Sequence, residues 1–75
     1  MRDATDVAAT VTDADLTLLA ALARGGKDEI VARRLGVSTR TFRRRLLDLM
    51  QRLGVTSRFQ IGATAARAGL LPYEP

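Results

Sequence analysis

The chain has 75 residues, a net charge of +4 and neither cysteine nor histidine. This length leaves room for one domain near the lower size limit for folding without cross-links, and the missing residue types exclude disulfides, thiolate or imidazole metal sites and the commonest catalytic base. We therefore expect neither an enzyme nor a bound metal, cofactor or small-molecule ligand. The chain shows no signal peptide and no apolar run of roughly 20 residues, so we also expect a cytoplasmic protein with no membrane partner.

The residue pattern predicts an all-α fold, a compact four-helix domain that contains a helix-turn-helix and spans residues 11–71. No segment has the alternating pattern of a strand. Residues 1–10 are small, polar and aperiodic, which predicts a disordered leader or linker. Residues 72–75 are expected to form a short C-terminal tail.

The first helix is predicted over residues 13–24. The Thr12 hydroxyl can cap its first backbone amides, and Asp15, three positions later, partly reproduces the return arm of a capping box. One buried stripe is expected on this helix, with Val11 packed back against it, and it consists of Leu18, Leu19, Leu22 and Ala23.

The second helix, over residues 27–35, leads into a corner. Its inward face is expected to consist of Val31, Ala32 and Leu35. Gly36 then supplies the left-handed backbone that ends the helix, Val37 fills the corner, and Ser38 caps the helix that follows. A short helix, a Gly-Val-Ser turn and a capped helix together indicate a helix-turn-helix.

The third helix, over residues 39–53, carries two unlike faces. At 100° per residue one narrow apolar stripe is expected to be buried, namely Phe42, Leu46, Leu49 and Leu53. The opposite side holds Arg40, Arg44, Leu47 and Gln51, with Arg43 beside them and Arg45 near the rim of the stripe. Because the arginine fork can grip a phosphate or read guanine O6 and N7, this face suits entry into the major groove of DNA.

The positive charge is concentrated around this corner. Residues 24–58 hold ten cations and three anions, a net charge of +7, whereas residues 1–15 have a net charge of −3. A polyanion is the natural partner of the basic part, and nucleic acid is favoured over an anionic membrane because the cations follow a helix pattern. The alternative is that these arginines form only a solvated helix face. The preceding corner favours DNA over that alternative.

A last helix is predicted over residues 57–69, after Gly54 and the cap Ser57. It carries two apolar lines, one of Phe59, Ala63, Ala66 and Leu70 and the other of Ile61, Ala65 and Ala68. Either both lines are partly buried in the monomer, or the second is only small alanines left in solvent, or one line forms a contact between two copies.

These features together resemble the LuxR/GerE-type helix-turn-helix domain, which is also the effector domain of NarL-like response regulators. The resemblance covers residues 11–71 without gaps, and its landmarks are VT, LLAALARG, IVARRLGVS, TF, RLGVTSR and AGLL. The composition, rich in arginine and alanine, is similar to that of actinobacterial members. The linker-like segment DATDVAAT favours a fragment of a longer regulator over a stand-alone regulator of the GerE kind.

The resemblance implies a transcription regulator that binds double-stranded DNA sequence-specifically, as a homodimer on two half-sites about one helical turn apart. The third helix would enter the major groove, with base contacts from Thr41, Arg43, Arg44 and Leu47. The phosphate contacts implied are Lys27, Ser38, Arg40 and Arg58. The last helix would mediate dimerisation through Phe59, Ala63 and Ala66. RNA polymerase is a further candidate partner of such a regulator.

Three positions depart from the family pattern. Asp15 stands where members often have glutamate, and Arg45 replaces the usual histidine with a longer, permanently charged side chain. Leu47 stands where members often have a polar or basic residue that reads a base. Contact with a thymine methyl group is one use for Leu47, so the base preference at this position is open.

Two other functions fit a helix-turn-helix. A sigma-factor region 4 shares the corner and the basic helix but binds promoter DNA as part of polymerase, and the tail SRFQIGATAARAGLL fits the LuxR-type pattern instead. A protein-interaction module would bind its partner through the apolar last helix, while the basic face would only keep it soluble. Negligible affinity for genomic DNA at low salt would favour that module.

Overall fold

The computed structural model describes residues 4–71. Within this range the chain is all-α, as predicted, and it holds five helices and no strand, where four helices were expected. Their bounds are α1 Ala4–Thr10, α2 Asp13–Ala23, α3 Asp28–Leu35, α4 Thr39–Leu53 and α5 Arg58–Arg67. The last four agree with the predicted helices to within two residues at each end. None of the described helices is both long and apolar enough to cross a membrane.

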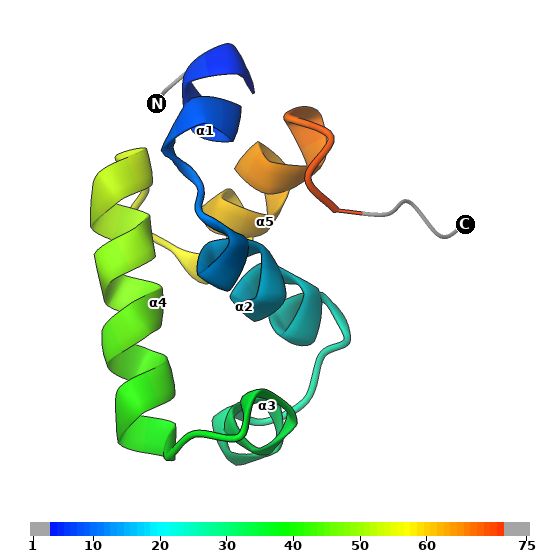
Figure 1. Cartoon of the computed structure of the whole chain (residues 1–75), viewed down its shortest axis with the longest axis vertical. Helices are drawn as coiled ribbons and strands as arrows, with labels where there is room; N and C mark the ends of the chain where they lie inside the picture. Colours follow the sequence, from blue (N-terminus) through cyan, green and yellow to red (C-terminus); the bar gives the residue numbers. More distant parts are fainter. Residues whose placement is uncertain (1–3, 72–75) are drawn as a thin grey trace.

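The additional helix, α1, corrects the expectation of a disordered leader over residues 1–10. Val7 on this helix has no exposed surface, and α1 lies against α5 and α4 (Figure 1). Val7 is the one large apolar residue of α1, so the segment shows no apolar period, and burial of Val7 against the other helices accounts for its order. Residues 1–3 of the expected leader and the expected tail at 72–75 lie outside the described residues.

The predicted cap at the start of α2 is confirmed in both directions. The Thr12 Oγ1 atom accepts a hydrogen bond from the Asp15 backbone N–H at 3.2 Å, and the Asp15 carboxylate accepts one from the Thr12 N–H at 3.0 Å. Leu18 and Leu19 are buried as expected. Ala23, by contrast, is exposed because α2 ends there, and Ala21 is buried in its place.

The corner between α3 and α4 forms as the sequence indicates. Gly36 adopts a φ of 71°, a left-handed conformation that glycine tolerates without steric cost, and so ends α3. The Ser38 side chain accepts a hydrogen bond from the Thr41 N–H at 3.1 Å and so caps α4. Figure 1 shows α3 end-on, while α4 lies along the plane of the picture, and the two helices are packed directly together. This arrangement is a helix-turn-helix.

The predicted stripe of α4 forms the centre of the hydrophobic core. Phe42, Leu46, Leu49 and Leu53 are all buried, together with Met50. The core is completed from the neighbouring helices by buried residues such as Leu19, Val31 and Ile61. Because the inner side of α4 is fully occupied by this core, its other side is left to solvent.

The two apolar lines of α5 differ in burial. Ile61 and Ala65 are completely buried, so their line packs on the core, with Ala68 half-buried at its end. Phe59, on the other line, keeps 84% of its surface exposed. The structure therefore identifies the line that begins at Phe59 as the one turned outward.

Candidate nucleic-acid interface

The outer side of α4 is basic and exposed. The four arginines at positions 40, 43, 44 and 45 are all exposed, and so is Gln51. Leu47 lies among them with 59% of its surface exposed. The opposite side of the same helix is buried, so the core prevents α4 from rotating about its axis and keeps the cations facing outward. A helix that enters a DNA groove needs its contact residues held on one side in this way.

One carboxylate, that of Asp28 in the first turn of α3, binds Arg43 from this side of α4 and Arg58 from the start of α5. Its Oδ2 atom accepts a hydrogen bond from Arg43 Nε at 2.9 Å, and its Oδ1 atom accepts one from Arg58 Nη1 at 2.5 Å. Hydrogen bonds from Arg43 and then from Arg58 lower the pKa of Asp28, and the same contact with Asp28 raises the pKa of Arg43. The Arg58 guanidinium also lies 5.8 Å from the centre of the Phe42 ring, within range of a cation–π contact.

Three of the predicted contact residues line one open groove. Arg43, Leu47 and Arg58 meet there, and the groove has a volume of about 330 Å³. Its remaining lining comes from the start of α3, from α4 and from the segment before α5, with Asp28, Leu46, Met50, Thr56 and Ser57. The structure therefore brings Arg58, which is distant in the sequence, next to the base-reading candidates of α4.

Arg44 lies elsewhere, although it follows Arg43 directly. It lines a second open groove, of about 430 Å³, between α2 and α4. Arg45, Asp48 and Arg52 line the same groove from α4, and Ala14, Asp15 and Leu18 line it from α2. The two arginines predicted to contact bases thus have different neighbours, and Arg44 shares its groove with two carboxylates.

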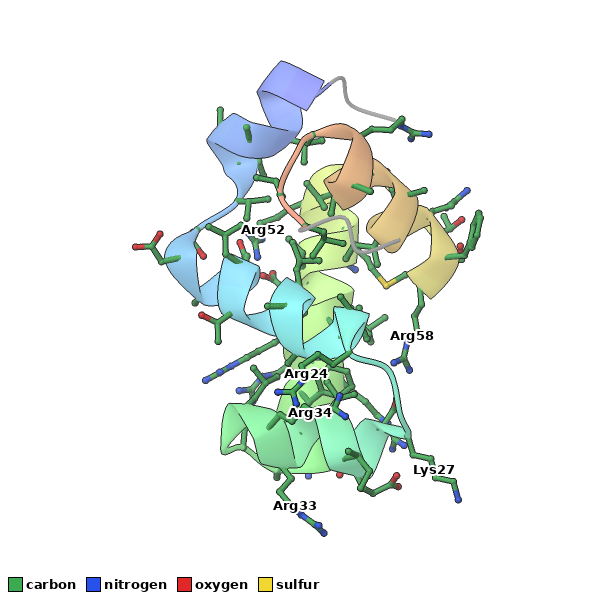
Figure 2. The ribbon with its side chains drawn as sticks, turned by 90° about the vertical axis from the view of Figure 1, so that its right-hand side faces the viewer. Arg24, Lys27, Arg33, Arg34, Arg52 and Arg58 are labelled. Carbon is green, nitrogen blue, oxygen red and sulfur yellow. The ribbon has the colours of Figure 1, made fainter. Side chains whose placement is uncertain are left out.

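Two arginines of the basic segment are engaged in holding the fold. Arg52 donates hydrogen bonds to Asp15 and to Asp48. Arg34 donates to the backbone oxygen of Ala21 at 3.1 Å and to that of Gly25, and so closes the end of α2. In Figure 2 Arg34 lies between α2 and α3, whereas Lys27 and Arg33 point away from the ribbon. The net charge of residues 24–58 therefore overestimates the number of cations that are free to bind a partner.

The remaining predicted phosphate contacts lie at helix starts. Lys27 precedes α3 and is exposed, and Arg40 is exposed in the first turn of α4. The Ser38 hydroxyl both accepts from the Thr41 N–H and donates to Thr41 Oγ1, at 3.0 Å. Thr41 is half-buried. The Ser38 hydroxyl proton is thus already donated to Thr41, and Ser38 must rotate before it can donate to DNA.

The predicted dimer residues share the outer side of α5. Phe59 and Ala66 are exposed there, and Ala63 is half-buried. None of the described residues forms a cluster of potential metal ligands.

The pairing of Asp28 with two arginines cannot be read from the sequence. An acid in the first turn of a helix is explained by the helix dipole alone, and nothing local indicates its two arginine partners, 15 and 30 positions away. The one available signal was the clustering of arginines on the adjoining helices.

The described residues therefore define an all-α domain in which a helix-turn-helix presents a basic helix to solvent. No family model and no solved structure matches the chain. It is similar to the bialaphos biosynthetic pathway regulatory protein of Streptomyces hygroscopicus, with 56% identity over 61 residues that make up 81% of this chain and 24% of that protein. It is also similar to the transcriptional regulatory protein YdfI of Bacillus subtilis, with 36% identity over 64 residues, which are 85% of this chain and 30% of that protein.

The chain thus spans less than a third of the length of either relative. What these comparisons establish is homology to a part of two proteins named as regulators. The resemblance to the LuxR/GerE type stays a prediction from the residues.

Proposed function

We propose that this chain is a DNA-binding domain of a transcription regulator and that α4 enters the major groove of double-stranded DNA. The observation that carries the proposal is the basic outer side of α4, held in place by a buried inner side and a helix-turn-helix corner. Arg43 and Arg58 line one groove at this surface, so a base edge and a phosphate could be contacted together. The names of the two relatives support a regulatory role. Such a domain needs no catalytic group or cofactor, and it acts in the cytoplasm.

The domain binds as a homodimer through α5. Phe59 exposes 84% of its surface at the start of this helix, and the small residues Ala63 and Ala66 continue the same line, which permits close approach of a second helix. Two copies of one apolar line can cover each other around a two-fold axis. The dimer would then present two α4 helices to two half-sites about one helical turn apart.

The DNA-binding proposal is tested by titrating duplex DNA with wild type and single-arginine variants across a salt series. Arg43→Ala and Arg44→Ala should each weaken DNA binding. If the lost contact is to a phosphate, the slope of log affinity against log salt should fall in magnitude by about 1. If the lost contact is to a base, the binding free energy for a preferred sequence should weaken by about 1 to 3 kcal/mol. Arg24→Ala is the matched control, because Arg24 is an exposed cation at the end of α2 and not on α4. Equal binding by all four proteins would contradict the assignment of α4 as the reading helix.

A further inference from the structure

The groove on the α3 side of α4 holds a carboxylate beside two cations that are proposed to meet DNA. A negative charge at such a place repels phosphate, so its presence needs a reason. Asp28 is not a solvated acid, because its side chain is only 19% exposed and each of its two oxygens binds a different arginine. The contacts connect the starts of α3 and α5 with α4.

The contact with Arg43 leaves the end of the guanidinium free. Asp28 accepts from Nε alone, at 2.9 Å, and within the described residues Arg43 forms no other hydrogen bond. Arginine carries five N–H donors in one plane, so fixing Nε fixes the direction of the two terminal amino groups. Those amino groups form the fork that matches the O6 and N7 atoms of a guanine. A hydrogen bond to Nε therefore orients the fork without occupying it.

The second oxygen of Asp28 keeps the carboxylate itself in place. It binds Arg58, whose guanidinium lies 5.8 Å from the ring of Phe42, and that ring is completely buried in the core. Arg43 is thus held by a carboxylate that is held in turn by a core-anchored cation. Its side chain nevertheless remains 58% exposed, so that the oriented fork stays accessible.

We infer that Asp28 is a positioning residue for base recognition: it holds Arg43 so that the terminal amino groups face a base edge. Its negative charge lowers the affinity for any duplex, while its hydrogen bond to Arg43 raises the preference for one sequence. This inference rests on the proposed function. It makes two predictions of opposite sign, because removal of the charge strengthens binding to any duplex, whereas removal of the orienting bond reduces the preference for one sequence.

Glu29 provides a matched control for the charge. It follows Asp28 on the same turn, is exposed, and is close enough to Arg43 for its charge to contribute to the raised pKa of that arginine. Among the described residues it forms no ion pair with Arg43 or Arg58, which both bind Asp28. Glu29→Gln therefore removes the same unit charge and leaves the orienting bond intact.

The test uses the full chain and two duplexes, the one most enriched by wild type from a random-sequence DNA pool and a scrambled duplex of equal length and composition. Affinity is measured for both, and their ratio is the readout. Glu29→Gln should strengthen binding to both duplexes and leave the ratio within about twofold of wild type. Asp28→Ala, which removes both acceptor oxygens, should also strengthen binding to the scrambled duplex but lower the ratio by about fivefold or more, the size of a lost bidentate base contact.

A second variant separates positioning from a general loss of structure. Arg43→Lys keeps the charge, lacks the fork and changes an exposed side chain, so it should lower the ratio as much as Asp28→Ala. The double variant should lose no more than Arg43→Lys alone, because both changes remove one interaction. A ratio in Asp28→Ala equal to that in Glu29→Gln, or additive losses in the double variant, would overturn the inference. Wild type that binds no duplex at low salt would instead overturn the proposed function.

Discussion

Arg52, near the end of α4, donates two parallel hydrogen bonds of 2.7 Å each to the carboxylate of Asp15, in the first turn of α2. The two residues are 37 positions apart, and the Asp15 carboxylate is also the return arm of the capping box with Thr12. One side chain therefore fixes the start of α2 and joins this helix to α4, the helix proposed to read DNA. The paired side chains are only 34% and 10% exposed, so water screens this pair less than a surface ion pair.

Replacement of Asp15 by asparagine should destabilise the domain. The variant loses the charge that Arg52 binds and one of the two oxygens that accept from it, so a partly buried guanidinium keeps only part of its pairing, which should cost about 1 to 3 kcal/mol. Urea unfolding followed by circular dichroism measures the change. Asp13→Asn is the control, since Asp13 lies in the same first turn but is exposed. Equal unfolding free energies for the two variants would show that the Asp15 pair contributes nothing beyond the helix dipole.

Stability should also fall in acid for the same reason. The hydrogen bond from Arg52, ahead of the contacts with Thr12, lowers the pKa of Asp15 in the folded state below the ordinary value of 3.8. A carboxylate with a lowered folded pKa stabilises the protein fully above its unfolded pKa, and this contribution is lost as the pH falls through 3.8 toward the folded pKa. Wild type should therefore lose unfolding free energy in this window more steeply than Asp15→Asn. Parallel pH curves for the two proteins would contradict this assignment.

The first described helix gives a prediction about the leader. Val7 is completely buried and holds α1 against α5 and α4, so Val7→Ala should lower the unfolding free energy by about 1 to 2 kcal/mol. Ala8→Ser, on the exposed side of the same helix, should have little effect. Thermal unfolding of the full chain compares the two. If Val7→Ala unfolds at the temperature of wild type, the leader contributes no packing and the sequence-based expectation of disorder was right for this segment.

The outward line of α5 predicts the assembly state. Phe59→Ser should shift a wild-type dimer toward monomer in sedimentation equilibrium, because it removes the largest exposed apolar side chain from the proposed contact. Ile30→Ser changes another exposed apolar residue, on α3, and should leave the equilibrium unchanged. Wild type that stays monomeric in the presence of DNA, or a Phe59→Ser variant that stays dimeric, would exclude this face as the dimer contact.

The helices were predictable because their boundaries depend on short-range interactions. Thr12, Ser38 and Ser57 each accept a hydrogen bond from an amide three positions later, and Gly36 and Gly54 end their helices through their own backbone conformation. The buried stripe of α4 followed from the helix period alone. These features can be derived from a window of a few residues.

The arrangement of charge was not predictable in this way. The sequence shows ten cations between residues 24 and 58 but not that Arg52 binds Asp15 or that Arg43 and Arg58 share Asp28. Those pairs depend on how α2, α3, α4 and α5 pack, and a helical wheel places residues on one helix only. The wheel therefore grouped Arg43 with Arg44, whereas the folded domain directs them to different grooves.

Selection of bound duplexes from a random-sequence DNA pool by the full wild-type chain tests the central claim most directly. A domain that reads DNA with α4 as a homodimer should enrich one sequence with two-fold symmetry, its half-sites about 10 base pairs apart from centre to centre. The enriched sequence should also contain a guanine, and the Arg43→Ala variant should no longer enrich that guanine. A pool that stays random after selection, although the protein binds it at low salt, would contradict sequence-specific recognition and leave only electrostatic attachment to phosphate.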